Sequence, residues 1–227
     1  MPLPLAPVAV VTAVMTLRSD TKPVKVYIKK PRGTLYWGGA GLNGPYITDQ
    51  IQALLNAGIQ HVYRGVNTTG NEKTDALWTA TTLRYEDTDE WTISRGLDNP
   101  SGQFNLIGYS YGSLLAAQTA NFYANNGHVV DHLVLIACPI DSRFLNSLIM
   151  NKNIKSVIKI NLTDADDPLY AGMSETELVT SAKILMDQDA ASGTTKGIGH
   201  FYFRPDSPEG KERRTRLAKY LYDQGLR

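Results

Sequence analysis

The sequence has little cysteine, little histidine and almost no excess of charge of either sign. Its 227 residues include one cysteine, four histidines, 23 basic and 22 acidic side chains. A single cysteine excludes an intramolecular disulfide, so the fold does not need an oxidising compartment. Balanced charge argues against a nucleic-acid partner, because phosphate backbones are recognised by clustered lysine and arginine. The one dense basic segment, residues 211–216, lies in a predicted terminal helix, where a solvated face explains it.

The first 17 residues are almost wholly apolar, yet they lack the marks of a signal peptide. They have no basic start and no small-x-small cleavage site, and they contain Pro2, Pro4 and Pro7. The segment is also too short and too rich in proline to span a bilayer. We interpret it as a strand, and we expect a cytoplasmic protein with no stable membrane insertion.

Short apolar runs alternate with segments of helical period, which predicts an α/β fold. Residues 8–17 and 24–29 resemble an antiparallel hairpin with one wet face. The rest predicts one domain over residues 1–227, with a mostly parallel sheet, helices on both faces and little or no cap domain. Residues 66–102 give no clear pattern beyond a weak helix at 72–80. The predicted strands lie near residues 34–37, 61–63, 104–107, 133–138 and 157–162, and the helices near 45–58, 111–123, 144–150, 175–186 and 208–225.

The central motif is a Gly-x-Ser-x-Gly turn made by Gly108, Ser110 and Gly112. It lies between a predicted buried strand and a predicted helix. A serine in such a turn takes a strained backbone conformation, and its neighbours must be nearly free of side chain for the turn to close. The free N–H groups at the start of the helix then face the serine hydroxyl. This arrangement favours acyl transfer with Ser110 as the nucleophile.

A serine hydroxyl needs a base, and His200 is the best-placed histidine in the sequence. It lies in a glycine-rich loop before the last helix, whereas His132 begins a strand and is interpreted as structural. The histidine needs a carboxylate to fix its tautomer. Asp167, just after the strand at 157–162, is our choice, with Asp164 and Asp166 on the same loop as alternatives. The outside candidate is Asp141.

The order Ser110, Asp167, His200 resembles that of the α/β-hydrolase family, and the resemblance covers nearly the whole chain. It implies an oxyanion hole formed by the N–H of Tyr111 and by a second N–H, from Ala40 or Gly39, in the loop after the third strand. The sequence departs from the family where Trp37 stands in place of the histidine of many lipases and esterases. The short span from Cys138 to the strand at 157–162 leaves little room for a cap domain.

The leading hypothesis is a serine esterase or lipase that cleaves lipid or small acyl esters through an acyl-enzyme on Ser110. The alternatives are a thioesterase or amidase with the same triad, and a non-catalytic binding protein that keeps the fold. No metal or organic cofactor is implied. Trp78 and Trp91 are candidates to line an acyl groove. A compact hydrolase of this kind also resembles bacterial lipase effectors exported by a dedicated secretion system, which would imply an immunity or secretion partner.

Overall fold

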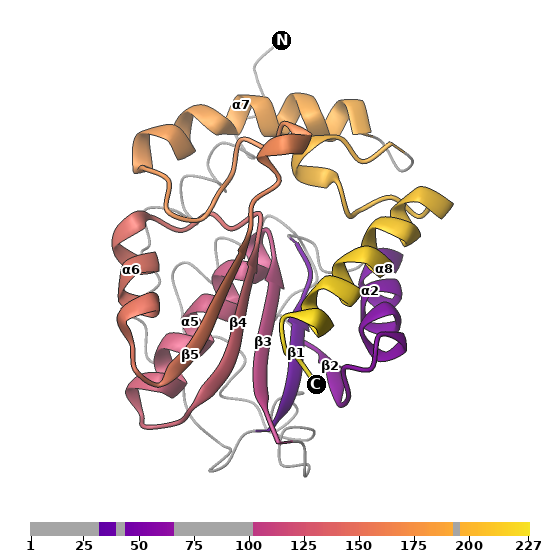
Figure 1. The fold of residues 1–227 in the computed structure, drawn as a ribbon. Helices are drawn as coiled ribbons and strands as arrows, with labels where there is room; N and C mark the ends of the chain where they lie inside the picture. The colour runs from indigo at the N-terminus through magenta and orange to yellow at the C-terminus, as the bar shows by residue number, and fades with distance from the viewer. Residues whose placement is uncertain (1–31, 40–43, 66–101, 193–195) are drawn as a thin grey trace.

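The computed structural model describes residues 32–39, 44–65, 102–192 and 196–227 (Figure 1). Several sequence predictions lie outside these residues and stay predictions. They are the N-terminal hairpin at 8–17 and 24–29, the weak helix at 72–80, the oxyanion candidate Ala40, and the groove candidates Trp78 and Trp91.

The described strands form one sheet of five, and every neighbouring pair is parallel. Their order is β2-β1-β3-β4-β5, which confirms the predicted α/β fold with a mostly parallel sheet. Every residue of β3 is buried, as expected for a strand covered on both faces. The strands are β1 (Gly33–Trp37), β2 (Val62–Arg64), β3 (Phe104–Tyr109), β4 (Val130–Ile136) and β5 (Ile154–Ile160).

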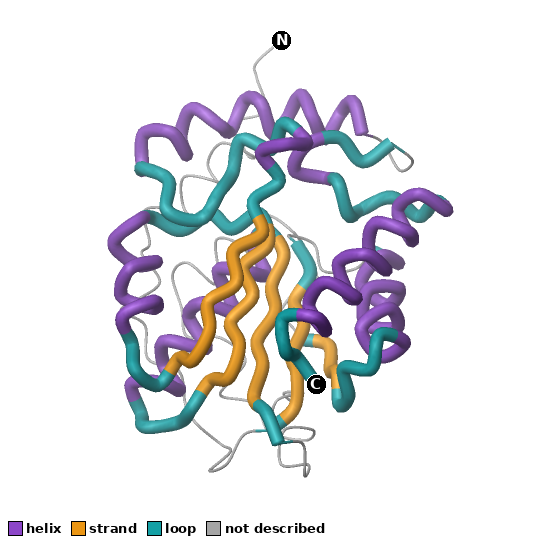
Figure 2. Tube along the Cα trace, in the orientation of Figure 1, coloured by secondary structure: helices purple, strands orange, loops and turns teal. Residues whose placement is uncertain are grey.

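Helices cover both faces of the sheet (Figures 1 and 2). On one face, α5 (Tyr111–Asn125) and α6 (Ser142–Met150) pack against the strands. On the other, α2 (Pro45–Asn56) and α8 (Pro208–Asp223) pack against each other and the sheet. This places the apolar core in two layers, one on each side of β3.

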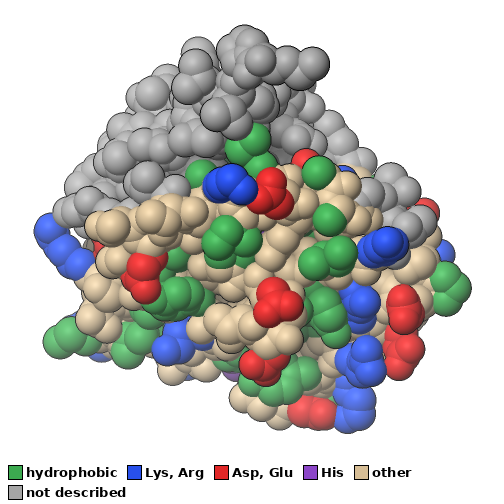
Figure 3. All heavy atoms as spheres, turned by 90° about the horizontal axis from the view of Figure 1, so that it is seen from above, with side chains coloured by type: hydrophobic (Ala, Val, Ile, Leu, Met, Phe, Trp, Pro, Cys, Tyr) green, Lys and Arg blue, Asp and Glu red, His purple; other side chains and the backbone are tan. Residues whose placement is uncertain are grey.

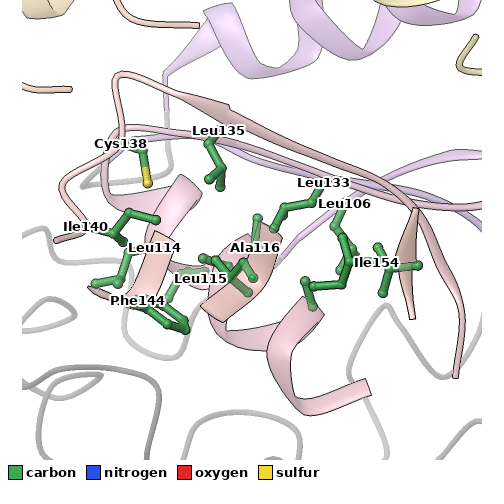
Figure 4. Packing of buried hydrophobic residues seen from close by; sticks show 14 of the residues in the cluster. Leu106, Leu114, Leu115, Ala116, Leu133, Leu135, Cys138, Ile140, Phe144 and Ile154 are labelled. Atoms are coloured by element: carbon green, nitrogen blue, oxygen red, sulfur yellow. The ribbon is translucent and has the colours of Figure 1, made fainter. Parts of the chain in front are cut away.

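Most residues of α5 are buried, because this helix packs along β1, β3 and β4, with α6 beside it on β5 (Figure 4). Leu115 and Ala116 have no exposed surface. The many alanines of α5 let its backbone approach the sheet closely, and larger side chains from the strands fill the remaining space. The helix that follows Ser110 is therefore held firmly in place. Figure 4 labels Leu106, Leu114, Leu133, Leu135, Cys138, Ile140, Phe144 and Ile154 around it.

The helix α8 confirms only part of the expectation that residues 211–216 form a solvated basic face: Lys211 and Arg216 are exposed, but the middle of the segment is not. Arg214 in this segment is fully buried. Its guanidinium donates to the carbonyls of Phe203 (2.7 Å) and Pro205 (2.8 Å) and to the carboxylate of Asp49 on α2 (3.0 Å). The planar fork of arginine suits such a site, where several acceptors converge. Arg214 thus ties the loop after His200 to α8 and α2.

The helix α7 (Glu175–Ser192) crosses above the carboxyl ends of the strands (Figure 1). It begins with the predicted capping box, in which Glu177 Oε2 accepts from Ser174 N (2.8 Å) and Ser174 Oγ accepts from Glu177 N (3.2 Å). It ends at Ser192 rather than near Met186. Between β4 and β5 the chain forms only the short α6, with no larger insertion.

One predicted strand is placed differently: β4 ends at Ile136, before Cys138. Ala137 has a φ of 50°, a left-handed conformation that breaks the strand. Cys138 is nevertheless buried, as expected. Over the part of the chain that the structure describes, no helix has the length and apolar character needed to cross a membrane.

Candidate active site

Ser110 lies between the end of β3 and the start of α5, in a strained conformation. Its φ is 56° and its ψ is −127°, values that a residue with a side chain rarely adopts. Hydrogen bonds hold this backbone from both sides: Ser110 N donates to Ile136 O (2.8 Å), and Ser110 O accepts from Ser113 N (2.9 Å). The sheet and the helix together therefore fix the position of the hydroxyl.

The two glycines of the motif are required by close backbone contacts. A Cβ at Gly108 would lie 2.3 Å from the carbonyl oxygen of Gly112, and a Cβ at Gly112 would lie 2.2 Å from the carbonyl oxygen of Gly38. Both distances are far shorter than van der Waals contact. Glycine at these two positions is what lets α5 begin directly against β1 and β3.

The structure brings Ser110, His200 and Asp167 together. Ser110 Oγ lies 2.5 Å from His200 Nε2. On the other side of the imidazole, His200 Nδ1 lies 3.0 Å from Asp167 Oδ2 and 3.1 Å from Oδ1. The side chains of His200 and Asp167 are almost completely buried. A buried carboxylate beside Nδ1 favours the tautomer with the proton on Nδ1, which leaves Nε2 able to accept the serine proton.

The other acidic candidates lie away from this arrangement. Asp141 caps α6, where its Oδ1 accepts from Phe144 N (2.7 Å). Asp164 and Asp166 are exposed on the short 3-10 turn η3 (Thr163–Ala165) and just after it. Neither makes a recorded contact with His200, whereas Asp167 is buried beside it. Of the four aspartates considered, only Asp167 touches the imidazole.

His132 has a structural environment, as expected. It lies on β4, and its Nδ1 is 2.8 Å from the Oδ1 of Asn105 on β3. Asn105 in turn donates to Thr34 Oγ1 on β1 (3.0 Å). The pKa of His132 is lowered, mainly because burial disfavours the charged imidazolium. This chain of polar groups links three neighbouring strands near their amino ends.

Sequence reasoning missed the residue that joins the His200 loop to the Asp167 loop. Gln188 on α7 accepts from His200 N through Oε1 (2.9 Å) and donates to Asp166 O through Nε2 (2.6 Å). Gly199 must be glycine here, since a Cβ would lie 2.2 Å from the Gln188 amide, and its φ is 56°. No sequence signal marks Gln188, because a glutamine within a helix is ordinary.

Tyr109, the residue before Ser110, contacts His200 through both its hydroxyl and its ring. Its hydroxyl donates to His200 O, and its ring stacks on the imidazole with centroids 5.8 Å apart and planes at 24°. Burial raises the pKa of Tyr109 well above its ordinary value, and the nearby Tyr46 and Asp167 raise it further. Tyr109 therefore stays protonated and remains a hydrogen-bond donor throughout the physiological range.

Of the candidate oxyanion donors, Tyr111 and Gly39 lie beside Ser110. Tyr111 is the first residue of α5. A Cβ on Gly39 would lie 3.4 Å from Ser110 Cβ, so the loop after β1 passes close to Ser110. The Gly39 N–H, however, donates to the hydroxyl of Tyr46 on α2 (2.9 Å). The sequence did not indicate that the Tyr46 hydroxyl would accept a hydrogen bond from the Gly39 N–H.

Cys138 lies near the serine turn but has no reactive character. Its thiol is fully buried, and this burial raises its pKa to about 12, although the nearby Ser113 side chain and Ile140 backbone act in the opposite direction. A thiol that stays protonated at neutral pH is a poor nucleophile. Within the described ranges, no three His, Cys, Asp or Glu side chains gather in a way that could hold a metal ion.

The face above the carboxyl ends of the strands mixes apolar groups with charges of both signs (Figure 3). Its exposed apolar side chains include Ile184 on α7 and Ile198, two residues before His200.

A family model described as a thioesterase domain matches residues 97–158. This segment contains β3, the serine turn, α5, β4 and α6, and it ends before Asp167 and His200. The searches of curated proteins and of solved structures found no match.

Proposed function

We propose that this protein, whose serine turn lies within a thioesterase-domain match and whose fold is consistent with an α/β-hydrolase, hydrolyses acyl thioesters through an acyl-enzyme on Ser110. The observation that carries this proposal is the contact between Ser110 Oγ and His200 Nε2, backed by Asp167. The thioesterase-domain match supports cleavage of an acyl ester or thioester and favours the thioester. The lipase and esterase classes expected from sequence remain predictions for the same site.

In the proposed first half-reaction, Ser110 Oγ attacks the carbonyl carbon of the thioester while His200 Nε2 takes the hydroxyl proton. Asp167 stabilises the resulting imidazolium through Nδ1–H. The carbonyl oxygen becomes an oxyanion, which the N–H of Tyr111 and a second N–H from the loop after β1 would stabilise. The tetrahedral intermediate then collapses, the C–S bond breaks, and His200 returns the proton to the leaving thiolate.

In the second half-reaction, a water molecule takes the place of the thiol. His200 Nε2 accepts a proton from this water, whose oxygen attacks the acyl carbon. A second tetrahedral intermediate forms and collapses, the bond from carbon to Ser110 Oγ breaks, and the proton returns to the serine. The carboxylic acid leaves and the enzyme is restored. No metal or organic cofactor is needed for this sequence of steps.

The test compares matched thioesters and oxygen esters, with acyl chains from acetyl to palmitoyl, in wild-type protein and in Ser110→Ala. We expect turnover of thioesters in the wild type and none above background in the variant, with the two proteins equally folded by circular dichroism. Faster turnover of the oxygen esters would return the assignment to an esterase. Substantial thioester turnover by folded Ser110→Ala would overturn the proposal.

A further inference from the structure

A cavity of about 410 Å³ opens on the α8 side of the sheet, where β5 ends. Its walls come from three separate parts of the chain: the end of β5, the segment after His200, and α8. The volume falls within the range of pockets that hold small molecules. The polar residues that line it, tyrosines included, are Lys159, Asn161, Tyr202, Arg213, Arg216 and Tyr220.

The lining of this cavity is cationic. Lys159, Arg213 and Arg216 contribute three positive charges, and no carboxylate lines the cavity. In the described part of the chain Lys159 forms no ion pair, and Arg216 pairs only with Glu212 (3.3 Å), where both side chains are more than 60% exposed. Exposed pairs of this kind are weak in water. An anion entering the cavity would therefore meet cations that are largely unneutralised.

Arg213 is held in place by contacts that leave its charge uncompensated. Its Nη1 donates to the carbonyls of Gly197 (3.0 Å) and Tyr202 (2.9 Å). The guanidinium also lies over the Tyr202 ring, 4.2 Å from its centroid. Carbonyl groups and an aromatic face orient a guanidinium without removing its charge. The cavity thus has one preorganised cation, Arg213, and two exposed ones, Lys159 and Arg216.

An exposed aromatic surface completes the cavity. Tyr220 on α8 is 46% exposed, so part of its ring is accessible to a ligand. Its ring offers a flat apolar surface against which a planar group can stack. The combination of an aromatic wall with several cations suits a ligand that has both a ring and a negative charge.

This cavity is separate from the serine site. None of Ser110, Asp167 and His200 lines it. Phe203 forms the wall between them, and its ring packs edge-on against Tyr109 with centroids 6.0 Å apart. This cavity could not be predicted from the sequence, because Lys159 is far from residues 211–216 along the chain and only the fold brings them together.

We propose that this cavity binds a phosphate monoester attached to a planar ring, such as a nucleoside monophosphate. Arginine and lysine together bind phosphate well, since the guanidinium fork matches two phosphate oxygens and the ammonium adds a point charge. The ring would stack on Tyr220. Binding at this site does not depend on Ser110, so the binding proposal and the proposed hydrolysis are tested independently.

Isothermal titration of the full chain with adenosine monophosphate, adenosine and inorganic phosphate tests this assignment. We expect adenosine monophosphate to bind with a Kd of about 1 mM or tighter, more tightly than adenosine or phosphate alone, and to weaken as salt increases. Equal affinity for adenosine and for adenosine monophosphate would show that the cations do not bind the phosphate, and would overturn the proposal. No binding of adenosine monophosphate would overturn the proposal.

A double variant and a matched control locate the site. Lys159→Gln combined with Arg216→Gln should weaken binding of adenosine monophosphate at least tenfold. Lys219→Gln, on the same helix but outside the cavity, should leave it unchanged. Equal losses in both proteins would overturn the location. If the double variant unfolds at a lower temperature than the wild type, the site is mapped instead by changes in the NMR amide shifts of wild-type protein titrated with adenosine monophosphate. Shifts confined to residues away from Lys159 and Tyr220 would overturn the location.

Discussion

Asp167→Asn isolates the role that the structure gives to the buried carboxylate. Asp167 Oδ1 accepts a hydrogen bond from Leu169 N (2.8 Å), and both carboxylate oxygens lie about 3 Å from His200 Nδ1. In the variant, the amide oxygen would keep the bond to Leu169 N, so the NH₂ group would face Nδ1. The imidazole would then carry its proton on Nε2 and would be unable to accept the proton of Ser110. A wrong tautomer of this kind lowers kcat by about 10⁴-fold.

Steady-state hydrolysis of a thioester substrate measures this effect. The variant should melt close to the wild type, because asparagine preserves the shape of the side chain. Asp164→Asn is the matched control, since Asp164 is exposed on the same loop, and it should leave kcat/KM unchanged. A fall of less than about tenfold in folded Asp167→Asn, far below the loss expected for a wrong tautomer, or a larger loss in the control, would refute the tautomer argument.

Three further predictions concern neighbouring groups. If the Gly39 N–H is an oxyanion donor, Tyr46→Phe frees it from the tyrosine hydroxyl. The variant should then raise kcat/KM by about fivefold, which corresponds to one net hydrogen bond. A fall in kcat/KM would show that the hydroxyl itself aids catalysis. With a pKa of about 12, Cys138 should have a thiolate fraction of about 10⁻⁴ at pH 8. A thiol reagent should therefore label it only after denaturation. Rapid labelling of the native protein would contradict its burial. Hydrogen bonds from Ser174 and Tyr170 lower the pKa of Glu177 to about 2, below its ordinary value of 4.5. Its contribution to stability is therefore full above about pH 4.5 and is lost as the pH falls toward 2. The difference in Tm between wild type and Glu177→Gln should shrink over that window, and a constant difference would argue against the capping role.

Much of the fold could be predicted because its determinants are local. Near-continuous apolar runs marked β3 and β4, and the Ser174 and Glu177 spacing marked the start of α7. The strained serine turn was also predictable, since Gly108 and Gly112 are needed wherever a strand meets a helix so abruptly. Boundaries were less accurate, as Ala137 shows: nothing in the sequence announces its left-handed conformation.

The contacts that support the candidate site could not be predicted, because they join residues far apart in sequence. Gln188 reaches both active-site loops only because α7 crosses above the carboxyl ends of the strands. Arg214 is buried only because three carbonyl and carboxylate acceptors converge on it, and local charge density suggested the opposite. Tyr46 reaches the amide of Gly39 for a similar reason. Composition and periodicity do not carry such information.

The most direct test of the account is covalent labelling of the native protein with a serine-directed phosphonate, followed by mass mapping of the modified peptide. If His200 activates Ser110, we expect one adduct, on Ser110, that is absent from Ser110→Ala and forms much more slowly in His200→Ala. Folded wild-type protein that stays unlabelled, or that is labelled at another residue, would contradict the claim that Ser110 is an activated nucleophile.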